Sequence, residues 1–200
     1  MSKNKQRCPW SASSREMTAY HDAEWGTPTR NDKKICRAFF LDTFQAGLSW
    51  AIILSKRENF ARAFKNFDPA TIAKFSQKDA ARLAQNPGII RNRLKIEAAI
   101  RNARLILGIQ KEHGSFAKYL WSFVGKKAKQ RAPKKEGEIP ATSTEAQALA
   151  RDLKSRGFKF TGPTTVYAFM QGIGMVNDHL VSCFRYKEIK TKNALLKKVR

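Results

Sequence analysis

No apolar run in this chain approaches the roughly 20 residues that a membrane-spanning helix requires. The first residues, Met1 to Arg7, are polar and contain no apolar signal segment. Both absences predict a soluble, intracellular protein located in the cytoplasm. Cysteine is also scarce, because three cysteines in 200 residues do not make a disulfide framework. Cys36 has no evident partner, and we expect it to be buried as a small hydrophobic side chain.

Acidic residues are few in comparison with basic ones. The chain has 16 Asp and Glu against 39 Lys and Arg, a net charge of +23. A field of one sign attracts polyanions, so nucleic acid is the leading partner. An anionic membrane surface and a merely solvated basic face are the alternatives. With 42% hydrophobic residues, a chain of this length buries about 70% of its unfolded surface, so we expect one compact domain.

Convincing strand alternation is absent, and the capping residues predict helices almost throughout, giving an all-α fold. Asp68-Pro69 and Ser76 to Asp79 each start a short helix. The longer predicted helices run from Asn31 or Asp32 to Phe44, Ser49 to Phe67, Arg91 to Lys111, Ser115 to Val124, a Thr142 capping box to Gly157, Thr164 to Gly172, and Asn177 to Phe184.

Two basic segments are expected to lie outside the packed domain, which we assign to residues 1–186. Residues 125–137 carry six Lys or Arg and almost no apolar side chain, which predicts an exposed loop. Residues 187–200 are predicted to form a basic C-terminal tail. Contact with phosphates and simple solubilisation are equally open for both segments.

Cysteine and histidine form two couples at opposite ends of the chain. Cys8 and His21 lie near the start, and His179 and Cys183 are spaced i, i+4, which on a helix places both on one face. Zinc binds such a set of four ligands in a tetrahedron. Neither couple has the tight C-x2-C spacing of most zinc modules, and burial of the residues in a core is the alternative.

Five strings lie in order along the chain: AYHDAEWG, QAGLSW, NPGIIRNRLKIEAAIRNA, RGFKFTGPTTVYAFMQ and GMVNDHLVSCF. From about Cys8 to Cys183 the sequence resembles the DNA-3-methyladenine glycosylase I family, zinc-containing helix-hairpin-helix proteins that excise alkylated adenine from DNA. The resemblance implies a helix-hairpin-helix DNA glycosylase-like fold. It also implies one structural Zn²⁺ that ties the termini together through Cys8, His21, His179 and Cys183. We expect a monomer.

The DNA-binding segment is expected at about residues 80–103, where two helices are joined by a turn with Pro87 and Gly88. Gly88 permits close backbone approach, and N–H groups at the start of the second helix can donate to a phosphate. Arg91, Arg93 and Lys95 line the approach in this interpretation. Together with the charge, this predicts that the chain grips the backbone of double-stranded DNA containing alkylated bases, and so lies on the nucleoid.

An enzyme that acts on a base must rotate it out of the duplex into a pocket that stacks on it. The resemblance implies that Tyr20 and Trp50 contact the flipped base and that Trp10 and Trp25 help to wall the pocket, although core packing is the usual role of scattered tryptophans. In the RGFKFTGPTT string, Phe160 and Thr164 are expected near the same pocket.

Methylation at N3 makes adenine a cation, so its glycosidic bond is already weakened before the enzyme acts. Selective binding of the cationic base can then supply much of the catalysis. A carboxylate helps to hold the base and to stabilise positive charge while water completes the hydrolysis. No Lys is placed as a Schiff-base nucleophile, which predicts a monofunctional glycosylase without lyase activity. We assign the catalytic roles to Asp42 and Tyr20.

Asp42 marks a departure from the family, which has Glu eight positions before the tryptophan of the QAGLSW string. The shorter side chain withdraws the carboxylate by about 1.5 Å, enough to lose a direct hydrogen bond. Excision through a bridging water is the favoured consequence; a changed base preference, or binding without chemistry, are the others. A non-catalytic or altered-specificity protein that binds alkylated DNA is therefore the alternative function, and an RNA-binding or ribosome-associated protein is a third.

The remaining acidic residues of these strings are expected to serve in supporting roles. Asp22 and Glu24 are predicted to orient His21 on the metal or to cap a helix, and Asp178 to support His179.

Overall fold

The computed structural model describes residues 5–125 and 127–195, with side chains as far as Thr191. In chain order, the elements are η1 (Pro9–Ser13), α1 (Arg15–Ala23), α2 (Asp32–Gln45), α3 (Trp50–Ala63), η2 (Lys65–Phe67), α4 (Pro69–Ile72), α5 (Gln77–Ala84), α6 (Arg93–His113), α7 (Phe116–Ser122), β1 (Lys129–Gln130), η3 (Glu136–Glu138), α8 (Thr144–Ser155), α9 (Pro163–Gly172), β2 (Val176–Asn177) and α10 (Phe184–Leu195). The all-α prediction is confirmed, apart from one parallel pair of two-residue strands.

Side-chain caps define where the helices begin. The Asn31 side chain accepts a hydrogen bond from Lys34 N at the start of α2, and Ser76 and Asp79 form a reciprocal capping box at α5. The capping box predicted at Thr142 is wrong by one residue, because Ser143 is the N-cap of α8. Gly114 ends α6 in the left-handed conformation. Local sequence therefore fixed most helix boundaries to within a few residues.

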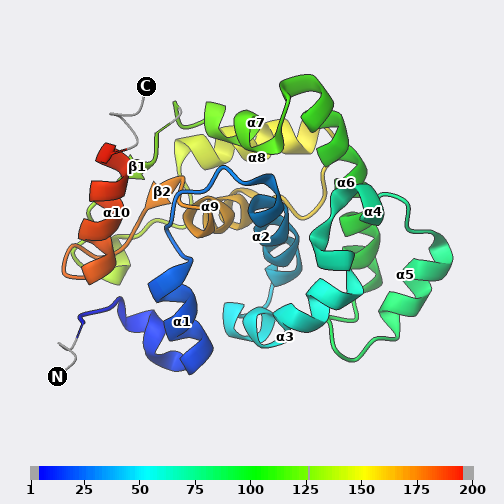
Figure 1. Cartoon of the computed structure of the whole chain (residues 1–200), viewed down its shortest axis with the longest axis horizontal. Coiled ribbons are helices and arrows are strands. Elements are labelled where there is room, and N and C mark those ends of the chain that lie inside the picture. The colour runs from blue at the N-terminus through cyan, green and yellow to red at the C-terminus, as the bar shows by residue number, and fades with distance from the viewer. Residues whose placement is uncertain (1–4, 126, 196–200) are drawn as a thin grey trace.

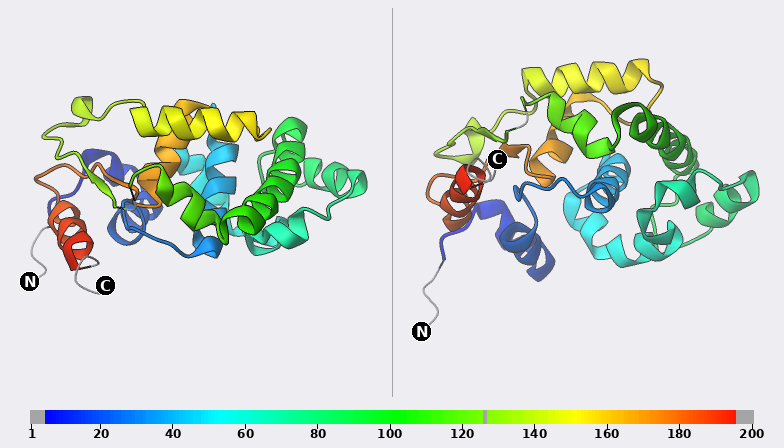
Figure 2. Two further views of the ribbon diagram at one scale, coloured as in Figure 1. Left: turned by 90° about the horizontal axis from the view of Figure 1, so that it is seen from above. Right: turned by 45° about the horizontal axis from the view of Figure 1, so that its top comes forward.

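Helices α2 and α9 lie in the middle of the molecule, with α7 and α8 along one side and α3 to α6 at one end (Figure 1). At the other end lie α1, α10 and the strand pair, and the additional views show the same grouping (Figure 2). One large core is rich in phenylalanine and joins α2 to the surrounding helices, and a small second cluster surrounds Cys8 and Cys183. In the part of the chain that the structure describes, no helix is long and apolar enough to span a membrane.

The predicted helix from Asn177 to Phe184 is wrong. Asn177 belongs to β2, which pairs with β1, and the backbone then turns through the interior until α10 begins at Phe184. The buried Asp178 side chain accepts hydrogen bonds from Tyr167 Oη and Gln171 Nε2. These hydrogen bonds anchor the segment before α10 to α9. The burial of these polar groups outweighs the local sequence pattern that predicted a helix here. Asp178 therefore supports α9 rather than the ring of His179.

The two basic segments are held more closely than the sequence suggests. Most described residues of 125–137 are exposed, as predicted, but Lys129 pairs with β2 and forms an ion pair with Glu145. Residue 126 lies outside the described residues. The predicted tail begins inside α10, and Ile189 on that helix is fully buried. The domain thus extends past residue 186, and residues 196–200 lie outside the described residues.

Candidate functional site

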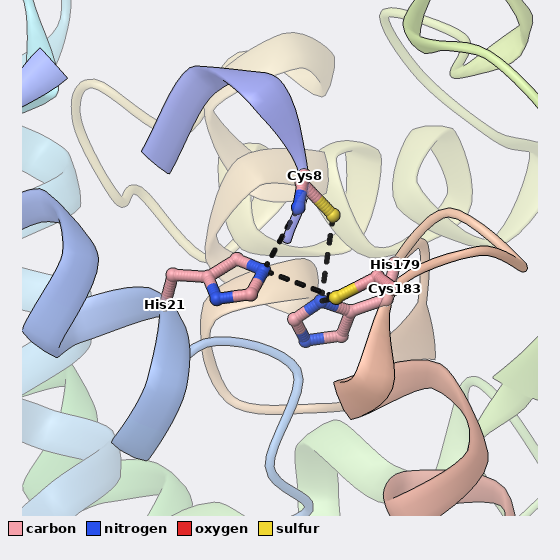
Figure 3. Close-up of side chains that lie close together, drawn as sticks. All are labelled: Cys8, His21, His179 and Cys183. Carbon is pink, nitrogen blue, oxygen red and sulfur yellow. Dashed lines mark hydrogen bonds between the residues drawn. The ribbon is translucent and has the colours of Figure 1, made fainter. Parts of the chain in front are cut away.

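The four predicted metal ligands converge on one point in the interior (Figure 3). All are buried, and their ligand atoms lie within 4.8 Å of one another. Cys183 Sγ lies 3.4 Å from His21 Nε2 and 3.6 Å from His179 Nδ1, and Cys8 Sγ lies 3.6 Å from His179 Nδ1. Neighbouring N and S ligands of tetrahedral zinc are about 3.5 Å apart, given bond lengths of about 2.0 and 2.3 Å. The group could therefore hold a metal ion.

Each imidazole ring is oriented by a second hydrogen bond. His21 Nδ1 lies 2.8 Å from Asp22 Oδ1, and His179 Nε2 lies 3.1 Å from the Trp25 carbonyl oxygen. These acceptors place the ring protons on the outward nitrogens and leave Nε2 of His21 and Nδ1 of His179 as lone-pair donors toward the cluster. The orienting role predicted for Asp22 agrees with this geometry. Arg7 holds the Asp22 carboxylate in turn, with Nη2 2.8 Å from Oδ2.

The two thiols have opposite acidities. A hydrogen bond from Cys8 lowers the pKa of the Cys183 thiol. The same bond raises the pKa of Cys8. A cation at the centre of the cluster would replace the proton that the two sulfurs share, as metal binding to thiols requires.

Trp10 and Trp25 pack around this cluster. The Trp10 ring lies 5.3 Å from the His21 ring and 5.0 Å from Trp25, and the Trp25 ring lies 4.5 Å from His179. The 3-10 helix η1 brings Trp10 to the cluster and the turn after α1 brings Trp25, and the two rings form its apolar shell. Tyr20, another predicted pocket residue, packs against the same cluster.

Tyr20 and Trp50 meet between α1 and α3, with ring centroids 5.2 Å apart. Asp42 lies on α2 and is only 6% exposed. Burial raises the pKa of the Asp42 carboxyl well above its usual range. Burial, followed by the proximity of Asp42, likewise raises the pKa of Tyr20. The structure thus brings together three residues that are distant in sequence.

Two polar groups at this point lack partners. No hydrogen bond to the Asp42 carboxylate occurs within residues 5–125 and 127–195, and the buried Trp50 Nε1 also lacks a partner there. A buried polar group without a hydrogen bond costs about 1–3 kcal/mol, and an unpaired buried carboxylate costs more. Water, an ion or a bound ligand can supply the missing partner of such a group.

A cavity of about 320 Å³ lies against the same two rings, bounded by α1, α2 and α3. Its lining includes Tyr20 and Trp50 but not Asp42. Glu24, predicted to support the metal, instead lines this cavity and bonds to Arg57 at 2.6 Å and Arg37 at 3.2 Å. Sequence reasoning missed this group, because residues 24, 37 and 57 share no motif.

The turn between α5 and α6 is well ordered by its own side chains. Asn86 Oδ1 accepts a hydrogen bond from Gly88 N at 2.9 Å, so this N–H is already occupied. A Cβ on Gly88 would lie 3.1 Å from the Asn59 side chain, so glycine permits close packing against α3. Arg91 and Arg93 are exposed beside the turn, and Arg93 pairs with Glu97.

Lys95 corrects the prediction of a DNA contact. It is 5% exposed, and its ammonium group donates a hydrogen bond to the Phe44 carbonyl oxygen at 2.8 Å and another to the Ala46 carbonyl oxygen. A cation at the C-terminus of a helix satisfies carbonyls that have no partner within the helix. Lys95 therefore ties α6 to the end of α2 and to the loop that leads into Trp50.

Phe160 and Thr164 lie apart from the cavity. Phe160 adopts a φ of 56°, and its ring lies 5.9 Å from Lys95 Nζ. Thr164 is exposed in the first turn of α9. Neither lines the cavity beside Tyr20, so their predicted roles near the base stay predictions.

Comparison with known proteins gives one consistent result. Residues 10–186 match the sequence profile of the methyladenine glycosylase family. DNA-3-methyladenine glycosylase 1 of Escherichia coli K12 is 43% identical over 181 residues, which cover 90% of this chain and 97% of that protein. DNA-3-methyladenine glycosylase of Haemophilus influenzae is 42% identical, with 88% and 96% covered.

Solved structures agree. A crystal structure of 3-methyladenine DNA glycosylase I superposes with a TM-score of 0.87 at 45% identity, covering 90% of this chain and 98% of that one. A variant of 3-methyladenine DNA glycosylase I in complex with 3-methyladenine gives a TM-score of 0.86 at 35% identity, with 89% and 96% covered.

Proposed function

The chain belongs to the methyladenine glycosylase family, and we propose that it hydrolyses the N-glycosidic bond of 3-methyladenine in alkylated DNA, after rotating the base out of the duplex. The matches to this family confirm the family assignment made from the sequence. The proposal includes a monofunctional reaction without lyase activity and a monomeric enzyme acting on chromosomal DNA in the cytoplasm.

The observation that carries the proposal is the unpaired Asp42 carboxylate beside Tyr20 and Trp50. An N3-methylated adenine is a flat cation, and such a ligand offers a positive charge to the carboxylate and an aromatic face to the rings. Normal adenine carries no charge at neutral pH and leaves the carboxylate unpaired. The site thus discriminates through the electrostatic partner that only the damaged base supplies.

We propose two roles for Asp42. Its ionised form holds the cationic base and stabilises the positive charge that develops on the sugar as the glycosidic bond lengthens. Water completes the hydrolysis. Because Asp42 is one methylene shorter than the Glu of the family, we propose that a water molecule bridges the carboxylate to the base. Tyr20 packs beside the base, and the Trp50 indole N–H is available to an acceptor on it.

We assign the grip on the DNA backbone to the hairpin of α5 and α6. Arg91 and Arg93 are exposed there, while Lys95 is not. The first turn of α6 also carries the most exposed large apolar side chain of the described residues, Leu94 at 69%, and the loop before Trp50 carries Leu48 at 37%. Apolar side chains beside cationic ones suit a surface that holds phosphates while a base is removed from the stack.

We propose that the Cys8, His21, His179 and Cys183 cluster binds one structural Zn²⁺. Two thiols and two imidazoles form a closed tetrahedral set. The ion would join the segment before η1 to the turn before α10, where Phe184 N already donates to the Gln6 carbonyl oxygen. The cluster supplies no open position, so its contribution is to folding.

Release of 3-methyladenine from methylated duplex DNA tests the function. The natural protein should release the base, Asp42→Asn should lose most of this activity, and Asp42→Glu should retain or increase it. Asp42→Gln is the size-matched control for Asp42→Glu. Absence of release by the natural protein, with activity in Asp42→Glu, would instead favour the alternative of a protein that binds alkylated DNA without excising the base.

A further inference from the structure

A basic surface lies at one end of the molecule, formed by the loop at residues 127–135 and by α10. Figure 1 shows β1 and α10 at one end of the long axis and α5 at the other. The side chain of Asn177 joins the two basic segments, because its Nδ2 donates to Gln130 Oε1 and to the Tyr186 carbonyl oxygen. We call the exposed cations of these segments the terminal basic surface: Lys127, Arg131, Lys134, Lys135, Lys187 and Lys190.

The loop that carries four of these cations is fixed along its backbone. Strand β1 pairs with β2, and the carbonyl oxygen of the buried Pro133 accepts a hydrogen bond from Val181 N at 2.9 Å. Glu136 Oε1 accepts another from Trp10 N at 3.0 Å. Between these anchors, Ala132 has a φ of 61°, a conformation that a non-glycine residue keeps where the surrounding structure imposes it. A flexible solubilising segment needs no such anchors, so the loop holds its cations in a defined arrangement.

The charge of this surface is largely uncompensated. Within residues 5–125 and 127–191, the loop lysines other than Lys129 form no ion pair. The acidic groups nearby along the chain are engaged elsewhere. The Glu136 and Glu138 carboxylates accept hydrogen bonds from backbone N–H groups, and Glu188 pairs with Arg185 on α10. Exposed cations without acidic partners attract a polyanion.

The chemistry of the terminal basic surface favours a phosphate backbone over other anionic partners. The large apolar side chains that are exposed in the described part of the chain, Leu48, Ile52 and Leu94, all lie outside it. A helix that binds a membrane surface needs such side chains, and protein interfaces are centred on aromatic or apolar anchors. Binding to the phosphates of a nucleic acid needs only cations.

The base site lies between this surface and the α5–α6 hairpin along the long axis, because Tyr20 and Trp50 belong to α1 and α3 (Figure 1). A domain of 200 residues has a radius of gyration of about 16 Å and spans roughly 40 Å. One turn of a DNA duplex is about 34 Å long. A duplex centred on the base site therefore needs more than one helical turn to reach both ends of the molecule.

We propose that the terminal basic surface binds the phosphate backbone of the duplex that holds the damaged base, on the flank away from the α5–α6 hairpin. The surface thereby lengthens the stretch of DNA that the protein grips. Its assignment rests on the proposed function, because the damaged base sets the position of the duplex. The surface contributes to DNA binding and leaves the chemistry at Asp42 unchanged.

Fluorescence anisotropy with two duplexes tests this assignment. Each duplex carries a stable abasic-site analogue at its centre, and their lengths are about one and about three helical turns, roughly 10 and 30 base pairs. The test variant combines Lys127→Gln, Lys134→Gln and Lys135→Gln. On the long duplex it should reduce the slope of log K against log salt by about 2–3, because each lost phosphate contact removes about 0.9. On the short duplex it should keep the slope of the natural protein.

A charge-matched control combines Lys111→Gln, Arg151→Gln and Lys154→Gln. These residues are exposed on α6 and α8, outside the terminal basic surface. The control removes the same number of positive charges as the test variant, and it should keep the slope of the natural protein on both duplexes.

Three results would each overturn the proposal: no loss of slope in the test variant, an equal loss on both duplexes, or the same loss in the control. Unchanged slopes together with lost binding to vesicles of phosphatidylcholine and phosphatidylserine in equal parts would assign the surface to a membrane instead, and would also overturn it.

Release of 3-methyladenine from a short methylated duplex separates this assignment from the proposed function. The test variant should release the base at the rate of the natural protein, and slower release would place the loop in the base site and contradict the proposal. A loss of slope confined to the long duplex would support the surface even in a protein that releases no base, so failure of the proposed function is recognised separately.

Discussion

Replacing Lys95 with methionine tests whether this lysine stabilises the fold or contacts DNA. The ammonium group donates to two carbonyl oxygens at the end of α2, and methionine keeps most of the stem without donating. Each hydrogen bond to a charged group contributes about 1.5–3 kcal/mol. Because the Ala46 carbonyl is only partly buried, we expect a loss of roughly 3 kcal/mol of unfolding free energy. This corresponds to a decrease in Tm of about 6–12 °C for a domain of this size.

Thermal unfolding and the salt dependence of DNA binding together test this expectation. A lost phosphate contact reduces the slope of log K against log salt by about 0.9. Lys95→Met should keep the slope of the natural protein when measured well below its Tm. Arg91→Met, the exposed control, should reduce the slope and keep the Tm. The opposite pattern, a reduced slope with an unchanged Tm in Lys95→Met, would refute the structural assignment of this lysine.

Three further predictions concern acidity, metal and capping. Because burial holds the Asp42 pKa above its unfolded value, kcat/KM should rise with pH through the raised pKa. The unfolding free energy should fall as the pH rises from the unfolded pKa to the raised one. The pH profiles of Asp42→Asn should lack both changes, and a retained rise in activity would argue against Asp42. Purified protein should contain about one zinc per chain, lost in Cys8→Ala or His179→Ala; metal-free protein of unchanged Tm would exclude a structural ion. Asp32 accepts from Phe116 N and Ala117 N at the start of α7, so Asp32→Ala should cost about 1–2 kcal/mol in urea unfolding, and an unchanged midpoint would contradict this cap.

Much of the candidate site could be predicted from the sequence, because few residue types can bind a metal ion or stack on a base. Cysteine and histidine are rare in this chain, so two couples at its ends already indicated a metal site. Asp42, Tyr20 and Trp50 were identified through the resemblance of their strings to a family, and the structure brings them together. The Glu24, Arg37 and Arg57 group was not predictable. Charged residues are abundant here, and only packing decides which of them meet.

By itself, the sequence determined the helices, through caps such as Asn31 and Ser76, because capping is a hydrogen bond between near neighbours in the chain. It also determined which four side chains could hold a metal ion, because thiols and imidazoles are groups that bind zinc. Tertiary structure decided the direction in which side chains point. Lys95 lies two residues after the exposed Arg93 on the same helix. Its side chain nevertheless points inward, because it donates hydrogen bonds to the Phe44 and Ala46 carbonyl oxygens at the end of α2. His179 and Cys183 meet without the predicted helix, because the strand pair and buried Asp178 hold their backbone. Such choices depend on partners far away in the chain, which no local pattern encodes.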